Sequence, residues 1–149
     1  MTEPLTRHDP RLATWAAFLR AHARVVRELE RELQAEQRMA LTDYDVLVQL
    51  AAADDRRLRM SELADRLLLS RSGVTRLVDR LVAQGLVTRE ICDTDRRGQW
   101  AALTDAGLDR LRAASPTHLR GVGEHFLDRM SPDELASMQA ILARLDPEG

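Results

Sequence analysis

The side chains best suited to chemistry with a partner lie in residues 70 to 84. The apolar residues of this segment recur at intervals of three and four, so they share one face of a helix: Val74, Leu77, Val78 and Leu81. The opposite face carries hydroxyl and guanidinium groups in its first turns: Ser70, Arg71, Ser72, Thr75 and Arg76. Arginine can donate two hydrogen bonds to guanine, threonine can contact the thymine methyl group, and serine can contact phosphate. The pattern predicts a helix that reads base edges in the major groove of DNA.

A second group of arginines lies in a short loop between two β-tending runs. The runs are Leu86 to Ile91 and Gln99 to Leu103, and the loop between them, residues 92 to 98, has the sequence CDTDRRG. Arg96 and Arg97 at its tip suit insertion of a guanidinium into a narrow, electronegative minor groove. The two aspartates of the loop are interpreted as turn formers that hold the arginines in place. The segment is predicted to be a β-hairpin with a charged tip.

Two simpler interpretations of these charged surfaces are open at this point. A helix face and a hairpin tip with arginines can serve solubility alone. A winged helix can also bind another protein without reading DNA. The order of elements argues against the first, because a short helix from Met60 to Leu68 and a tight turn directly precede residues 70 to 84. The polar outward residues argue against the second, because protein-binding surfaces more often present apolar anchors.

The charge of the chain is unevenly distributed. Its formal net charge of −2 by itself argues against a polyanionic partner. Ten arginines and six acidic residues lie between Arg56 and Arg97, a net charge of +4, so the remainder of the chain carries −6. The chain has no lysine, and every fixed positive side chain is a guanidinium that can bind phosphate through two parallel hydrogen bonds. Positive charge is therefore concentrated where the DNA contacts are expected.

A long helix is expected before this region, from about Arg11 to about Gln37. Its inward residues are spaced alternately by three and four, as in a coiled-coil seam: Leu12, Trp15, Leu19, His22, Val26, Leu29 and Leu33. Few apolar residues lie outside this stripe. Such a helix needs a partner surface to be stable, and a second copy of the chain is the natural supplier.

Caps and turn formers set the expected boundaries of the next helices. Thr42 is the expected N-cap of a second helix that ends near Ala53, and a polar turn follows at residues 54 to 57. Ser70 is the expected N-cap of the reading helix, whose outward face continues one turn after Arg76 with an aspartate and an arginine. Gly85 stands where a left-handed helix end is needed.

Two further helices are expected after the hairpin. Thr104 caps a helix from Asp105 to about Met130, and Pro116 is expected to kink or break it. Ser131 and Glu134 form a capping box around a proline at the first helical position, which begins a last helix. The apolar residues of that helix form another seam: Leu135, Met138, Leu142 and Leu145.

Composition limits the class of protein. At 149 residues the chain suits one compact domain, or a reading unit with helices built around it. The single cysteine, Cys92, excludes an intrachain disulfide and fits a reducing compartment, and its acidic neighbours argue against a redox switch. There is no metal-ligand spacing, phosphate-binding loop, nucleophile motif, membrane-length apolar run or secretory signal. We therefore expect a cytoplasmic protein that is not an enzyme, with no cofactor, metal or membrane partner.

The reading unit has the sequence MSELADRLLLSRSGVTRLVDRLVAQGLVTRE, followed closely by DTDRRGQWAALTDAG. This pattern resembles the MarR family of bacterial transcription regulators, and the similarity extends over nearly the whole chain. The resemblance implies a mainly α, winged helix-turn-helix protein with a three-helix core and a β-hairpin wing. It divides the chain into an N-terminal dimerisation helix (1–40), a DNA-binding domain (41–104) and C-terminal dimerisation helices (105–149).

The resemblance further implies a ligand-responsive repressor, a homodimer that reads a pseudo-palindromic operator in double-stranded DNA. Helix 70–84 would enter the major groove and the wing, 92–98, the minor groove. The DNA contacts that carry over are Ser70, Arg71, Ser72, Thr75, Arg76 and Arg96, with Arg97 holding the wing together. The sequence departs from the family at Gly73, where a small β-favouring or hydroxylated residue is common. It also departs at Trp100 and the two alanines after it, where aliphatic and long polar residues are more usual.

Members of the family commonly bind a small aromatic molecule between the dimerisation helices and the DNA-binding lobe. The residues that could line such an effector pocket here are Trp15, Phe18, His22 and His118. The alternative for each of them is packing in the core or in the dimer interface.

Overall fold

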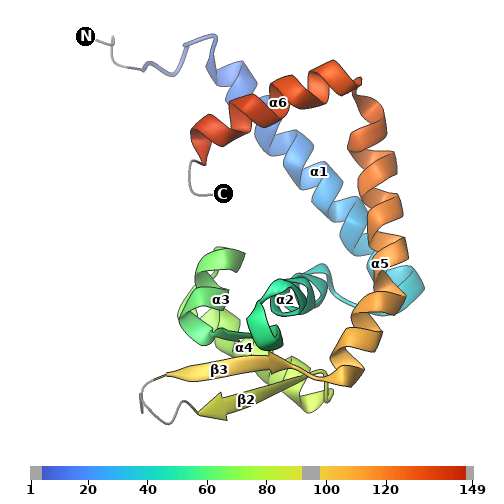
Figure 1. The fold of residues 1–149 in the computed structure, drawn as a ribbon. Coiled ribbons are helices and arrows are strands. Elements are labelled where there is room, and N and C mark those ends of the chain that lie inside the picture. The colour runs from blue at the N-terminus through green and yellow to red at the C-terminus, as the bar shows by residue number, and fades with distance from the viewer. Residues whose placement is uncertain (1–4, 92–97, 147–149) are drawn as a thin grey trace. The chain divides into compact units, whose positions relative to one another are not determined.

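The computed structural model describes residues 5 to 91 and 98 to 146 of the chain (Figure 1). Its elements, in chain order, are α1 (Leu12–Gln37), α2 (Leu41–Ala52), β1 (Arg57–Arg59), α3 (Met60–Leu67), α4 (Arg71–Ala83), β2 (Val87–Ile91), β3 (Gln99–Leu103), α5 (Asp105–His125) and α6 (Pro132–Leu145). Short 3-10 turns lie at Asp54–Arg56 and Leu127–Arg129. The predicted mainly α chain with a β-hairpin after the reading helix is confirmed.

The chain divides into two compact units. The first, called the central unit below, is Glu32–His118. The second, called the helical unit, combines Met1–Arg31 with Leu119–Gly149. The helices α1 and α5 each contribute residues to both units.

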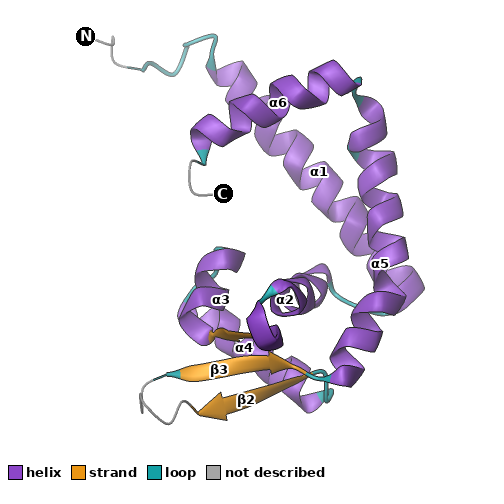
Figure 2. Ribbon diagram, viewed as in Figure 1, coloured by secondary structure: helices purple, strands orange, loops and turns teal. Residues whose placement is uncertain are grey.

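The central unit packs helices α2, α3 and α4 with a three-stranded antiparallel sheet of order β1-β3-β2 (Figure 2). In the register of this sheet, Arg59 of β1 faces Trp100 of β3, and Val87 of β2 faces Leu103. The largest fully buried side chains of the described chain all belong to this unit: Leu33, Val46, Leu47, Leu50, Leu63, Val74, Val78, Leu81 and Val87. This arrangement is the winged helix-turn-helix that the sequence predicts.

The turn from α4 through the hairpin into α5 is built by the residues expected there. Gly85 has φ +74, the left-handed conformation that glycine adopts without a steric penalty. The Thr104 hydroxyl accepts a hydrogen bond from the Gly107 N–H at 2.9 Å and donates to the Gly85 carbonyl at 2.8 Å. A Cβ atom on Gly107 would lie 2.1 Å from the Leu86 carbonyl oxygen. The start of α5 therefore needs glycine for its close approach to the end of α4.

Three local expectations are wrong. Thr42 does not cap α2, which begins one residue earlier at Leu41 after Ala40, because the Leu41 side chain is buried inside the helical pattern. The turn at 54–57 leads into the strand β1, which sequence reasoning missed because three residues are too short for a period-two pattern.

The third concerns α5, which does not break at Pro116, whereas a kink at this proline stays a prediction. The helix continues through the proline and ends at His125, before the predicted Met130. A proline removes one helical hydrogen bond, and the side chains beside it make other bonds. The Ser115 hydroxyl donates to the Leu111 carbonyl at 2.8 Å, and the Thr117 hydroxyl accepts from the Gln37 amide at 3.0 Å. The Ser115 bond lies within α5, and the Gln37–Thr117 bond ties α5 to the end of α1 within the central unit.

The helical unit contains α6, which begins with the predicted capping box. The Ser131 N–H donates to the Glu134 carboxylate at 2.8 Å, and the Glu134 N–H donates to the Ser131 hydroxyl at 3.3 Å. Hydrogen bonding of the Glu134 carboxylate to Ser131, first through the Ser131 backbone N–H, stabilises the charged form and lowers the pKa of Glu134 below its usual value. None of the residues Pro132–Leu145, all of them described, is buried. The helix is locally well formed, but its apolar side is only partly covered in the single chain.

None of the helices in the described chain has both the length and the apolar character needed to span a membrane.

Candidate nucleic-acid interface

Helix α4 separates its apolar and polar side chains as the sequence predicts. Its buried side chains are Val74, Leu77, Val78 and Leu81. Its exposed polar side chains in the first two turns are Arg71, Ser72, Thr75 and Arg76. The residues predicted to contact DNA from this helix are thus brought together on one solvent-facing surface.

The N-terminus of α4 is fixed by Ser70. Its hydroxyl accepts a hydrogen bond from the Gly73 N–H at 3.1 Å, which confirms Ser70 as the N-cap, and it lies 3.2 Å from the Ser72 hydroxyl. The first N–H groups of a helix lack carbonyl partners within the helix and carry partial positive charge. Ser70 satisfies one of them, and the end of the helix remains favourable for an anion such as a phosphate group.

The later part of the polar face has a different role from the one that the sequence suggests. The Arg80 Nε donates to an Asp43 carboxylate oxygen on α2 at 3.2 Å, and Nη2 donates to the same oxygen. The Asp43 side chain is almost fully buried, and its hydrogen bond raises the pKa of the Arg80 guanidinium above its ordinary value. Arg80 therefore anchors α4 to α2, and the polar side chains predicted to contact DNA are those of the first two turns.

Arg89 of β2 is a site residue that the sequence did not identify. Its guanidinium donates to the Thr75 carbonyl at 3.3 Å and to the Gln99 side chain at 3.0 Å, and it lies 2.7 Å from an Asp79 carboxylate oxygen. One side chain thus ties both strands of the hairpin to the reading helix. Strand alternation could have placed Arg89 on the face of β2 toward α4, but its partners depend on the packed arrangement.

The hairpin is confirmed up to the ends of its strands. Ile91 of β2 pairs with Gln99 of β3, so the strands approach the tip in the predicted antiparallel arrangement. Arg96, Arg97 and Cys92 fall outside the described residues, so their predicted roles at the wing tip stay predictions.

The four candidate effector residues fall into two groups. Trp15, Phe18 and His22 form a row along α1 in the helical unit, with ring centroids 6.1 and 6.4 Å apart in successive pairs. His118 belongs to the central unit, where its ring lies 4.4 Å from that of Tyr44 on α2.

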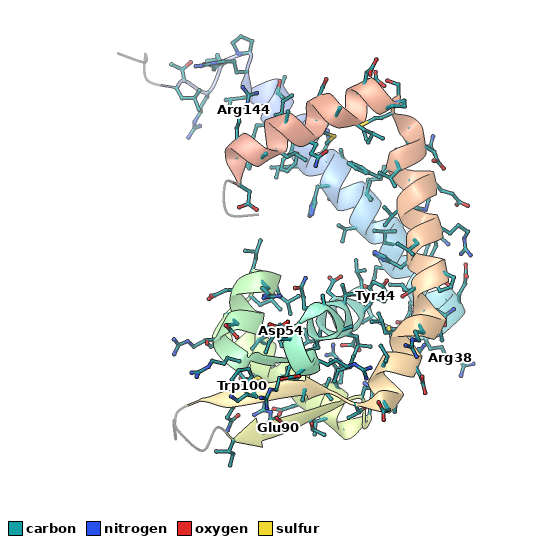
Figure 3. All side chains as sticks on the ribbon, viewed as in Figure 1. Arg38, Tyr44, Asp54, Glu90, Trp100 and Arg144 are labelled. Atoms are coloured by element: carbon teal, nitrogen blue, oxygen red, sulfur yellow. The ribbon has the colours of Figure 1, made fainter. Side chains whose placement is uncertain are left out.

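The His118 side chain is partly buried, and this burial affects its pKa. Burial lowers the pKa of the imidazole below its usual value, because the charged form loses hydration. The buried Nδ1 has no hydrogen-bond partner among the described residues. The Tyr44 hydroxyl donates to the Ser115 hydroxyl at 3.3 Å, and the Tyr44 ring lies tilted against that of His118. Figure 3 labels Tyr44. Burial therefore favours the neutral form of this imidazole over the charged form.

A three-helix core, an amphipathic α4 and a hairpin tied to it define the protein as a winged helix-turn-helix protein. Residues 39–98 match the family model described as MarR family. The crystal structure of Sco3205, a MarR family transcriptional regulator from Streptomyces coelicolor in complex with DNA, is similar with a TM-score of 0.87 and 35% sequence identity, covering 97% of this chain and 89% of that one. The chain belongs to the MarR family of transcriptional regulators.

Two curated relatives are similar over a shorter part of the chain. The regulator YkoM of Bacillus subtilis is 31% identical over 86 residues, which is 58% of this chain and 55% of YkoM. The transcriptional repressor MprA of Escherichia coli is 30% identical over 108 residues, which is 70% of this chain and 61% of MprA. The matched part thus spans less than two thirds of each of these two curated relatives. All three relatives are described as regulators or repressors of transcription.

Proposed function

We propose that the protein is a DNA-binding repressor that acts as a homodimer on a pseudo-palindromic operator. In this proposal α4 enters the major groove with Ser70, Arg71, Ser72, Thr75 and Arg76, and the wing at 92–98 brings Arg96 to the minor groove while Arg97 holds the wing together. Sco3205 is described in complex with DNA, which supports DNA binding. MprA is described as a transcriptional repressor, which supports repression.

The observation that carries this proposal is the first part of α4. Two arginines and short hydroxyl side chains are exposed there, directly beside a capped helix end, while the other face of the helix is fully committed to the core. Base recognition in the major groove needs this combination of a rigidly packed helix and short, polar, outward side chains. The exposed groups are polar, which argues against a protein-binding role for this surface.

The homodimer is supported by apolar side chains that the single chain leaves uncovered. On α1, Trp15 and Phe18 are 57% and 42% exposed, and on α6, Ile141 and Leu145 are 49% and 74% exposed. We assign residues 1–40 and 105–149 to dimerisation and 41–104 to DNA binding. Sedimentation at micromolar concentration should give a dimer, and a monomer would contradict this assignment.

A small aromatic effector and a cytoplasmic location complete the proposal. Trp15, Phe18, His22 and His118 are the residues that we propose for effector binding, and the stacked aromatic row on α1 suits a flat ring. A regulator of this kind must have access to the chromosome, and we infer that it acts in the cytoplasm.

The test is a titration of the purified protein with a fluorescent duplex from its own promoter region. We expect binding that prefers this duplex over a shuffled one, weakens steeply with salt, and protects two half-sites about 10 bp apart. Binding without sequence preference would contradict the proposal.

Substitutions separate the two DNA-reading elements. Arg76→Ala should reduce the preference for the operator over a shuffled duplex by about tenfold or more. Arg96→Ala should weaken binding to sites with A·T-rich flanks. Arg112→Ala is the matched control, because this arginine is exposed on α5, away from the polar face of α4. Equal binding by all three variants and the parent would contradict the assigned roles.

A further inference from the structure

The guanidinium of Arg89 lies between the hairpin and the reading helix. It donates to the Thr75 carbonyl on α4 at 3.3 Å, and it lies 2.7 Å from a carboxylate oxygen of Asp79, one turn further along the same helix. It also donates to the Gln99 side-chain oxygen on β3 at 3.0 Å. One side chain of β2 thus contacts α4 at two successive turns and also contacts the neighbouring strand. These four residues are called the Arg89 cluster below.

The sheet provides room for the Arg89 side chain. Arg89 is the register partner of Ala101 on β3, and the two side chains of such a pair point to the same face of a sheet. Ala101 and Val87 are buried, so this is the face that packs against the core. Ala101 is one of the two alanines at which the sequence departs from the family pattern. A longer side chain there would compete with the arginine for the same space, so core packing helps to set the position of the guanidinium.

The donors of Arg89 are committed to groups of the protein. Nη1 donates to Gln99, and Nη2 donates to Thr75 and lies closest to Asp79. The Arg89 side chain is only 29% exposed. A planar fork of donors suits several acceptors in fixed directions, which the single ammonium group of a lysine does not match. The geometry therefore favours a role for Arg89 in holding other residues in place over a direct contact with DNA.

The residues that Arg89 holds belong to both elements proposed to contact DNA. Thr75 lies on the exposed polar face of α4. Gln99 is the first residue of β3 and pairs with Ile91 at the end of β2, so it lies at the base of the wing. The Arg89 cluster therefore fixes the base of the wing against the part of α4 that is proposed to read bases.

Simultaneous contact with a major and a minor groove requires a defined distance between α4 and the wing. Hydrogen bonds to base edges weaken steeply when their distances and angles change. Attraction to phosphates is electrostatic and sequence-independent, and it tolerates small displacements. A displacement of the wing relative to α4 should therefore reduce base preference much more than general affinity for DNA.

We propose that Arg89 is a positioning residue for base recognition. Through Thr75 and Asp79 on α4 and Gln99 on β3, it sets the position of the wing relative to the reading helix, so that both elements meet the operator in register. This inference rests on the proposed DNA-binding function. It assigns part of the base preference to a residue that does not itself contact DNA.

The experiment measures the affinity of each variant for the promoter duplex and for a shuffled duplex over a range of salt concentrations. We expect Arg89→Ala to reduce the preference for the promoter duplex about tenfold. Its binding to the shuffled duplex and its slope of log K against log salt should stay parental, because no phosphate contact is lost. A slope reduced by about one, with equally weaker binding to both duplexes, would show that Arg89 contacts a phosphate and would overturn the proposal. A parental preference would also overturn it.

Arg57→Ala is the matched control. The Arg57 guanidinium forms an ion pair with Glu90 of β2 at 3.5 Å and so also joins two strands of the sheet. Glu90 follows Arg89 in the strand and therefore points to the opposite face, away from α4. Arg57→Ala should keep the parental preference, and a loss equal to that of Arg89→Ala would contradict a specific role for the Arg89 cluster.

Variants of the partner residue distinguish positioning from folding. Asp79 is 59% exposed, so Asp79→Ala weakens the same interaction without opening the core, and it should also reduce the preference for the promoter duplex. The double variant should show no larger loss than Arg89→Ala alone, because both substitutions remove one interaction. Arg89→Lys keeps the charge and should retain part of the preference. Additive losses in the double variant, with unchanged circular dichroism, would overturn the positioning role.

The parent protein separates this proposal from the proposed function. If the parent binds no DNA or shows no preference for the promoter duplex, the proposed function fails. If the parent prefers the promoter duplex and Arg89→Ala matches it, only the positioning role fails.

Discussion

The two compact units of this protein differ in how completely they cover their own apolar side chains. In the central unit, five leucines are fully buried: Leu33, Leu47, Leu50, Leu63 and Leu81. In the helical unit, α6 buries none of its residues, and α1 leaves Trp15 57% exposed. A buried leucine or aromatic side chain contributes about 1.5–3 kcal/mol to stability. The central unit therefore has its own hydrophobic core, whereas the helical unit gains most of its burial only when another surface covers it.

The units also differ in their polar interactions. The central unit contains long-range bonds between side chains, such as Arg80 to Asp43, which tie one helix to another. The described bonds of the helical unit are mostly local, as in the capping box of Ser131 and Glu134. Long-range bonds fix the tertiary arrangement, and local bonds only fix a helix. This difference fits a central unit that is rigid by itself and a helical unit whose helices are stabilised by association with a second chain.

The largest expected effect is the difference in stability between a leucine substitution in the central unit and one in the helical unit. Leu50→Ala should lower the free energy of unfolding by about 3 kcal/mol, because it leaves a cavity in a core where this side chain is fully buried. Leu145→Ala, at a 74% exposed position of α6, should change the stability of the single chain by less than about 0.5 kcal/mol. Urea unfolding, at one fixed protein concentration, measures both. Sedimentation should instead show weaker self-association for Leu145→Ala. Equal losses of stability in Leu50→Ala and Leu145→Ala would contradict the difference between the two units.

The next effect tests the long-range bond between α2 and α4. Arg80→Ala removes the guanidinium from the buried Asp43 carboxylate and should lower the free energy of unfolding by about 2 kcal/mol. This is less than for a fully buried ion pair, because the Arg80 side chain is half exposed. Adding Asp43→Asn should restore part of the loss, because the buried charge is removed as well. A double variant less stable than Arg80→Ala would argue against a charge left without its partner. Thermal unfolding of the three proteins gives the comparison.

A smaller effect tests the local stability of the helical unit. Ser131→Ala removes the N-cap of α6 and should cost about 1 kcal/mol, with a loss of helical signal in circular dichroism. Ser137→Ala is the matched control, because this serine is exposed inside the same helix, and it should be neutral or slightly stabilising. If both substitutions have the same effect, the cap does not hold the helix end.

The smallest effect concerns pH. Burial lowers the pKa of His118 in the folded protein, so the unfolded chain binds more protons as pH falls below the ordinary value of 6.5. The folded state should therefore be most stable above that pH and lose stability as pH decreases through 6.5 toward the lowered pKa of the folded state. His118→Gln should lose less stability than the parent between pH 7.5 and 5.5, measured by urea unfolding at constant ionic strength. A parallel loss in both proteins would show that His118 is not responsible.

Much of the fold could be predicted because its signals are local. Ser70, Thr104 and Ser131 cap helices through bonds that span three residues, and Gly85 supplies a backbone conformation that its own residue type favours. The amphipathic pattern of α4 likewise depends only on helical spacing. The predicted N-cap at Thr42 is wrong, because threonine is also common at positions that do not cap a helix. The helix instead begins at the buried Leu41, after Ala40.

The exposed polar face of α4, which we propose to read DNA, was therefore determined by the sequence itself, through residue types placed along one helix. Only the tertiary structure decided which of those residues remain available and what supports them. Arg80 is turned to Asp43, 37 residues away, and Arg89 joins the hairpin to Thr75. Trp100 meets Arg57 and Arg59 across a strand pair that no local pattern indicates. These contacts join side chains far apart in sequence, and their partners become definite only when the core has packed and set the distances between the elements.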